Sequence, residues 1–167
     1  MLGTLSRASD GRFALEFIRE LAHPQAKVWR ALTEVDQLRG WFVEMLDYDR
    51  SSLNFAESAE LTFIPQADRQ LPIGKGRVTK IDAPRLLEYT WDKEILRWEL
   101  EPKDNSACRL IFTNIFPDRV SAIEVAPGWH LGLDLLEAFL ADPRNTPNPL
   151  TSLAWEHLQS EYERALK

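Results

Sequence analysis

Few residues in this sequence carry chemistry, and none falls in the spacing of a known catalytic or metal site. The three histidines, His23, His130 and His157, form no pair with the tight spacing of a zinc motif such as HExxH. We expect surface or capping roles for them, with His130 nearest the mouth of any pocket. Cys108 is the only cysteine; Arg109 beside it is a cation of the kind that lowers a thiol pKa, but no histidine is adjacent. The sequence therefore predicts no catalytic residue, no metal ligand and no cofactor.

Acidic residues gather in two places, and neither has the pattern of a site. Glu44, Asp47 and Asp49 lack the ligand cadence and the glycine of a calcium loop, so we interpret them as a solvated acidic loop. Asp134 and Glu137 fall on the polar side of a long helix, which we expect to meet water. A general acid or base must reach a reacting group inside a cleft, so this pair is a weak candidate for catalysis.

The remaining chemical signal is a set of mostly aromatic residues that the periodicities turn toward one interior. Two interpretations stay open: a filled core, or the walls of a cavity for a small hydrophobic or amphipathic molecule. Buried Trp and Tyr need partners for their polar atoms, and pockets are mostly apolar with a few polar groups. The candidate cavity-lining residues are Phe17, Trp41, Tyr89, Trp91, Trp98, Phe112, Asn114, Trp129, Leu133 and Leu136.

One long helix is expected to face this set. Its apolar stripe, at helical spacing, consists of Trp129, Leu133, Leu136 and Leu140. His130 lies on the opposite face, with the acidic pair. Pro127 suits the first turn, where its missing N–H costs nothing, and Asp142-Pro143 ends the helix.

Alternating apolar and polar residues predict a series of strands before that helix. The predicted strands cover residues 13–21, 59–64, 77–81, 85–91, 95–101 and 108–116. Two short helices, over 24–34 and 35–42, are expected to cap one end of the sheet. Short turns make neighbouring strands antiparallel, and such a sheet has one apolar face. The long helix must cover that face, since no other predicted element is long enough.

Length and composition favour one domain spanning residues 1–167, with a flexible tail over 1–10 and an extra C-terminal helix over 150–167. The net charge of −6 disfavours nucleic acid and anionic membrane surfaces as partners. No apolar run reaches transmembrane length, so membrane insertion is not expected. The single cysteine and the absence of an apolar leader favour a cytoplasmic location.

Motifs spread over most of the chain carry a family resemblance. They are Ala22-His23-Pro24, Trp29–Thr33 (WRALT), Gly40-Trp41-Phe42, Gly76–Ile81 (GRVTKI), Asp82–Trp91 (DAPRLLEYTW) and Gly128-Trp129-His130. The sequence resembles START-like (SRPBCC) proteins and, more narrowly, the family related to the activator of heat-shock-protein-90 ATPase. This resemblance implies an α+β helix-grip fold like that of the birch-pollen allergen. In that fold a curved antiparallel sheet surrounds a long C-terminal helix, with a cavity between them.

Three functions follow as hypotheses. The first is binding of a small hydrophobic or amphipathic ligand in the cavity between sheet and helix. The second, implied by the resemblance, is a co-chaperone-like interaction module whose partner is a chaperone ATPase or a second copy of the chain. The third is a cyclase- or dehydratase-type enzyme, which needs an ionisable group in the cavity. The predicted lining contains none, so the sequence argues against an enzyme.

Overall fold

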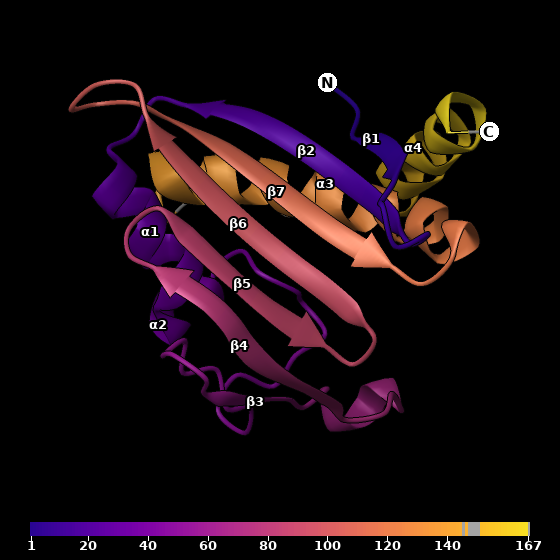
Figure 1. Ribbon diagram of the computed structural model, residues 1–167, viewed down its shortest axis with the longest axis horizontal. Coiled ribbons are helices and arrows are strands. Elements are labelled where there is room, and N and C mark those ends of the chain that lie inside the picture. Colours follow the sequence, from indigo (N-terminus) through magenta and orange to yellow (C-terminus); the bar gives the residue numbers. More distant parts are fainter. Residues whose placement is uncertain (145, 147–150, 167) are drawn as a thin grey trace.

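Seven antiparallel strands form one curved sheet in the order β1-β2-β7-β6-β5-β4-β3 (Figure 1). The computed structural model describes residues 1–144, 146 and 151–166. The strands are β1 (Thr4–Arg7), β2 (Phe13–Leu21), β3 (Glu60–Phe63), β4 (Gly74–Asp82), β5 (Leu86–Trp91), β6 (Glu94–Pro102) and β7 (Cys108–Phe116). The helices are α1 (Gln25–Thr33), α2 (Val35–Leu38), η1 (Ala67–Arg69, a 3₁₀ helix), α3 (Arg119–Ala141) and α4 (Ser152–Ala165).

The alternation predicted from the sequence is visible in the central strands. Every second residue of β7 is buried, and the register places Phe112 opposite Trp98 of β6 and opposite Phe17 of β2. Because side chains of paired residues lie on the same face of a sheet, these rings share the inner face. The apolar layer of the core therefore follows from strand periodicity.

α3 lies across this inner face along β2 and β7, as Figure 1 shows, and buries its apolar stripe against it. At its C-terminal end, Lys27 of α1 donates a hydrogen bond from Nζ to the carbonyl oxygen of Leu140 at 2.7 Å. A cation at a helix C-terminus is favourable because the last carbonyl groups lack intrahelical partners. This is the predicted helix-grip arrangement. Among the described residues, no helix combines the length and apolarity needed to cross a bilayer.

The predicted start of the long helix is wrong by eight residues. α3 begins at Arg119, and Pro127 lies inside it. The side chain of Asp118 caps the first turn by accepting hydrogen bonds from the backbone N–H and the hydroxyl of Ser121, both at 2.8 Å. This cap stabilises an earlier start, and a proline inside a helix removes a single backbone donor.

Two further elements differ from the predictions. The segment expected as a flexible tail contains β1, which pairs with β2 from Thr4 opposite Glu16 to Arg7 opposite Phe13. The helix predicted over 35–42 is confined to α2, and the chain turns after it.

The extra C-terminal helix is α4. Its first turn is capped by Thr151, whose hydroxyl accepts the Ala154 N–H at 3.2 Å. Residues 150 and 167, which belong to the predicted range, lie outside the described residues.

Candidate functional site

The predicted cavity-lining residues meet between the sheet and α3, and their rings pack directly on one another. Trp98 stacks on Phe112 with ring centroids 3.9 Å apart. Trp129 of α3 closes on both rings, at 5.9 Å from Trp98 and 4.5 Å from Phe112. Trp41, in the turn after α2, meets Trp98 edge to face at 5.8 Å. These are the separations of favourable aromatic pairs, so rings fill this part of the interior.

The polar atoms of these rings already have partners within the chain. The three indole N–H donors and their acceptors are Trp98 to the Tyr89 hydroxyl at 3.3 Å, Trp129 to Asn114 Oδ1 at 2.8 Å, and Trp41 to the Ala31 carbonyl at 2.9 Å. Buried polar groups are normally satisfied in this way. A ligand entering the ring cluster would have to replace these hydrogen bonds.

Nine of the ten predicted residues are buried, and one lies apart from the others. Trp91 is half-buried and stacks on Phe63 of β3 with centroids 3.9 Å apart and planes 5° from parallel. It therefore belongs to a second aromatic group over β3 to β5. That any of the ten contacts a ligand stays a prediction.

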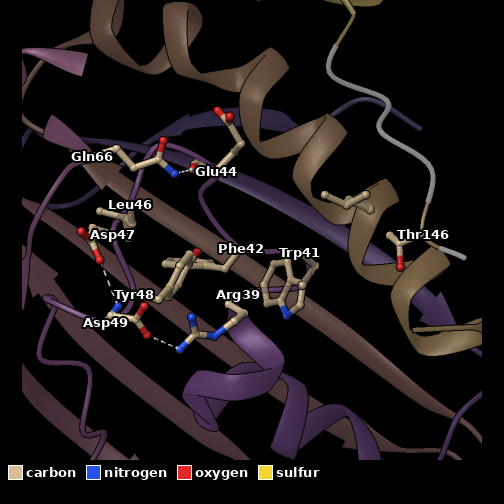
Figure 2. Close-up of a pocket in the computed structure, with 12 residues that line it drawn as sticks. Arg39, Trp41, Phe42, Glu44, Leu46, Asp47, Tyr48, Asp49, Gln66 and Thr146 are labelled. Carbon is tan, nitrogen blue, oxygen red and sulfur yellow. Dashed lines mark hydrogen bonds and ion pairs between the residues drawn. The ribbon is translucent and has the colours of Figure 1, made fainter. Parts of the chain in front are cut away.

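An open pocket of about 560 Å³ lies beside the ring cluster, between the 39–49 segment and α3 (Figure 2). Its apolar floor consists of Trp41, Phe42 and Leu46, and Leu135 of α3 faces them. Trp41 is thus the one predicted residue that lines this pocket. The polar rim consists of Arg39, Glu44, Asp47, Tyr48, Asp49, Gln66 and Thr146.

Hydrogen bonds fix the shape of the rim. Arg39 pairs with Asp49 at 3.0 Å, as Figure 2 shows, and its guanidinium lies 6.0 Å from the centre of the Tyr48 ring. The Tyr48 hydroxyl donates to the carbonyl of Val43 at 2.8 Å, and burial raises the pKa of this phenol. Asp47 Oδ1 accepts the backbone N–H groups two and three positions further along, both at 3.1 Å. The 39–49 segment can therefore hold a pocket open although it contains no regular helix or strand.

Sequence reasoning missed most of this pocket. Asp49 is exposed, as expected for the acidic loop, and Asp47 is half-buried, but both also form the rim of the pocket. Arg39, Phe42 and Tyr48 were not predicted as site residues. The available signal was the interleaving of aromatic and charged residues after α2, which strand or helix periodicity does not detect.

A cluster of three charged side chains lies where α3 faces β2. The side chain of Arg19, which is only 10 % exposed, pairs with Asp134 at 3.5 Å and with Glu137 at 3.3 Å. The expectation that these two acids only meet water is therefore wrong. The strand alternation already places Arg19 on the inward face with Phe17, because the two are two residues apart.

His130 is also not the surface residue that the helix periodicity predicts. Its side chain is 13 % exposed, because α4 covers it. The helical wheel identifies the face of α3 opposite the sheet, but it carries no information on the second helix that packs there.

The carboxylate of Glu94 is hydrogen-bonded to Asn114, the buried polar residue of the core. Asn114, with no solvent exposure, donates from Nδ2 to the carboxylate of Glu94 at 3.1 Å. Burial raises the pKa of Glu94, while the hydrogen bond from Asn114 lowers it. In the part of the chain that the structure describes, no three His, Cys, Asp or Glu side chains gather as a metal site would require.

A curved antiparallel sheet closed by a long helix over an aromatic core defines the START-like helix-grip class of proteins. Within this class, the chain belongs to the family described as activator of Hsp90 ATPase homolog 1-like protein, whose model matches residues 22–141. No curated protein matches the chain.

Solved structures share the fold at low sequence identity. A conserved protein of unknown function from Enterococcus faecalis has a TM-score of 0.80 at 20 % identity, covering 98 % of this chain and 90 % of its own. CalU16 from Micromonospora echinospora has a TM-score of 0.73 at 20 % identity, with 98 % and 96 % covered. A Bordetella parapertussis protein reaches 0.67 at 21 % identity, with 90 % and 85 % covered. At these identities the likeness concerns the fold alone.

Proposed function

We propose that this chain binds a small amphipathic molecule in the pocket between the 39–49 segment and α3. The observation that carries this proposal is the pocket itself, whose volume of about 560 Å³ falls within the roughly 300–1,000 Å³ of small-molecule sites. An apolar floor beside a polar rim suits a ligand that has one apolar and one polar end. Family membership supports the proposal, because the helix-grip fold provides such a space beside its long helix.

The pocket is a better candidate than the ring cluster. A ligand between Trp98 and Phe112 would have to separate two rings whose centroids lie 3.9 Å apart. The pocket needs no such rearrangement. Trp41 connects the two regions, since it lines the pocket and packs on Trp98. Binding in the pocket should therefore be reported by the indole groups of the core.

The apolar end of the ligand would lie on Trp41, Phe42 and Leu46. Each Å² of apolar surface removed from water contributes about 25 cal/mol. The polar end would meet Arg39 and Asp49, which already form an ion pair at the rim. Charged groups at such a position orient a ligand more than they add affinity.

Thermal-shift measurements with a panel of lipids and aromatic amphipaths test this proposal. We expect at least one compound to raise the melting temperature of the wild type. Leu135→Trp, which extends a half-buried side chain of α3 into the pocket, should abolish that shift. Leu153→Trp, on the exposed side of α4, is the matched control and should retain it. If no compound stabilises the wild type, or if Leu135→Trp binds normally, the pocket is not the site.

Interaction with a chaperone ATPase is a second candidate, favoured by the description of the family. We expect a purified Hsp90-type ATPase to bind the chain and to hydrolyse ATP faster in its presence. Surface plasmon resonance, to measure binding, and an ATPase assay, to measure hydrolysis, would test this interaction. A lack of both effects over micromolar concentrations would exclude this partner.

A further inference from the structure

Three segments that are distant in the sequence meet at one buried hydroxyl group. Tyr162 of α4 has no solvent exposure. Its hydroxyl oxygen accepts the backbone N–H of Gly3 at 2.9 Å and lies 2.8 Å from Nδ1 of His130. Gly3 directly precedes β1, and His130 belongs to α3; Figure 1 shows α4 next to β1. This hydrogen-bond chain connects the N-terminal segment, the long helix and the last helix.

The positions of the donors assign the protonation state of His130. The Gly3 N–H occupies one acceptor position of the Tyr162 oxygen, and among the described residues His130 Nδ1 is the one acceptor within hydrogen-bond distance of the Tyr162 hydroxyl hydrogen. The hydroxyl hydrogen is therefore paired when Nδ1 is unprotonated and acts as the acceptor. The ring hydrogen of a neutral imidazole lies on Nε2, which faces Asp134 Oδ2 at 3.7 Å. The chain of hydrogen bonds is therefore complete only with a neutral imidazole.

Protonation of His130 breaks this arrangement. A second ring hydrogen on Nδ1 would face the Tyr162 hydroxyl hydrogen, which then loses its acceptor. A buried donor without a partner is unfavourable, because it has lost its hydrogen bonds to water without replacement.

The surroundings of His130 oppose its charge on balance. The charged groups around it are Asp134 and Glu137 of α3, Glu161 of α4, Arg19 of β2 and the amino group of Met1. Burial is the largest influence and lowers the pKa of His130; Arg19 and the Met1 amino group lower it too. Asp134 and Glu161 raise it, without reversing the direction.

Besides the hydrogen bond that the Arg119 side chain donates to the carbonyl of Leu166, few other contacts hold α4 in place. Its buried side chains, in the described residues, are Leu158, Tyr162 and the following Leu166. Trp155 is 39 % exposed and lies edge-on above α3, where a Cβ at Gly128 would be 3.2 Å from the indole. An element with so few buried contacts opens locally at low free-energy cost, so a single hydrogen-bond chain can decide its position.

We propose that the His130–Tyr162–Gly3 chain is a pH-sensitive latch, which holds α4 and the N-terminal segment against α3 while His130 is neutral and releases α4 when it is protonated. This device lies apart from the proposed ligand pocket, and it stands whether or not that pocket binds a ligand. Release uncovers the surface of α3 around Gly128.

The direction of the effect follows from proton linkage. The pKa of His130 is lower in the latched form than the ordinary histidine value of 6.5, so the released form binds more protons. The latched form is therefore fully stable above about pH 6.5 and loses stability as the pH falls below that value. Below about pH 6.5, each further drop of one pH unit raises the equilibrium constant for release of α4 by up to about tenfold, because release is coupled to the uptake of one proton by His130.

Amide hydrogen exchange of residues 152–165, followed by mass spectrometry and corrected for intrinsic rates, measures the opening. Between about pH 7.5 and about pH 5, we expect protection of α4 in the wild type to fall with decreasing pH while β7 stays protected. Constant protection of α4 over this range would overturn the proposal.

Variants separate the latch from other titrations. His130→Asn supplies an amide oxygen close to the Nδ1 position and does not titrate, so protection of α4 should become independent of pH. Tyr162→Phe should give rapid, pH-independent exchange. The matched controls, His157→Asn at an exposed position of α4 and His23→Asn, should keep the response of the wild type. A pH response that survives in His130→Asn, or in Tyr162→Phe if the former does not fold, would show that the latch is wrong.

Discussion

Asn114 shows how a polar side chain can lie without solvent exposure inside an aromatic core. Its amide oxygen accepts the indole N–H of Trp129, and its amide nitrogen donates to Glu94 and to the carbonyl of Ile95. An amide carries both a donor and an acceptor, so one residue satisfies a helix side chain and a strand side chain together. The partners come from α3 and β6, so Asn114 also fixes the position of the helix on the sheet.

We expect Asn114→Leu to lower the free energy of unfolding by about 1–3 kcal/mol, because the Trp129 N–H and Glu94 would lose their shared partner in a buried place. Urea denaturation followed by far-ultraviolet circular dichroism measures the loss. A double-mutant cycle is the control: Trp129→Phe should cost less in the Asn114→Leu background than in the wild type. Equal costs in both backgrounds would show that the hydrogen bond is energetically irrelevant.

Glu94 predicts a pH dependence of stability. Burial raises its pKa, so the folded state binds more protons than the unfolded state just above the ordinary value of 4.5. The contribution of this group to stability is therefore lost as the pH rises through that window. Glu94→Gln retains an oxygen acceptor for Asn114 without the charge, so its stability relative to the wild type should increase from pH 4.5 to neutrality.

Denaturation midpoints of the two proteins over this pH range measure the difference. Glu57→Gln, at an exposed loop position, is the matched control and should show no such trend. A relative stability of Glu94→Gln that declines toward neutral pH would contradict the assigned direction.

At the scale of elements, the strands were the most predictable part of the fold. β2 and β7 have the predicted bounds, because their alternation of apolar and polar residues runs from end to end. The start of α3 was not predictable from its apolar stripe, since the cap at Asp118 precedes that stripe by several turns. β1 is four residues long, too short for a clear periodicity, and its pairing partner in β2 is what makes it a strand.

Two glycines in different elements should respond in opposite directions to the same change. In β4, a Cβ at Gly76 would overlap the carbonyl oxygen of Thr90 in β5, so Gly76→Ala must separate the two strands. We expect a loss of at least about 2 kcal/mol, comparable to overpacking in a core. In α3, a Cβ at Gly132 meets nothing within 4 Å, and Gly132→Ala should add up to about 1 kcal/mol through helix propensity.

Thermal denaturation of both variants checks this prediction, each serving as the other's control. A Gly76→Ala protein with the melting temperature of the wild type would mean that β4 and β5 leave room for a methyl group at this position.

At the scale of the whole molecule, the sequence predicts which rings gather but not how completely they fill the space. Periodicity turns Trp98, Phe112 and Trp129 toward one interior, as the structure confirms. Whether such rings enclose a cavity depends on differences of about a methylene group in their interdigitation, which no spacing rule contains. The open pocket depends on how the irregular 39–49 segment packs against α3, and this segment has no periodicity from which to predict it.

A filled interior makes its own prediction through Trp98, which touches rings from β7, α3 and the turn after α2. Trp98→Ala should lower the free energy of unfolding by about 3–5 kcal/mol, because the cavity left behind cannot collapse. That cavity would be apolar and enclosed, and such cavities bind small aromatic molecules. Free indole at ten times its Kd should therefore restore about 1.4 kcal/mol to the variant, and less to the wild type.

Denaturant titrations with and without indole measure both effects, with Trp155→Ala as the matched control because that indole is partly exposed on α4. Trp155→Ala should lose little free energy of unfolding, and indole should stabilise it no more than it stabilises the wild type. The rescue also distinguishes the two kinds of binding space in this fold. If indole stabilises Trp98→Ala but not the wild type, the space between the sheet and α3 is filled in the wild type. Ligands must then bind in the pocket beside it. If Trp98→Ala costs less than about 1 kcal/mol, the rings line an accessible cavity and the core is not filled.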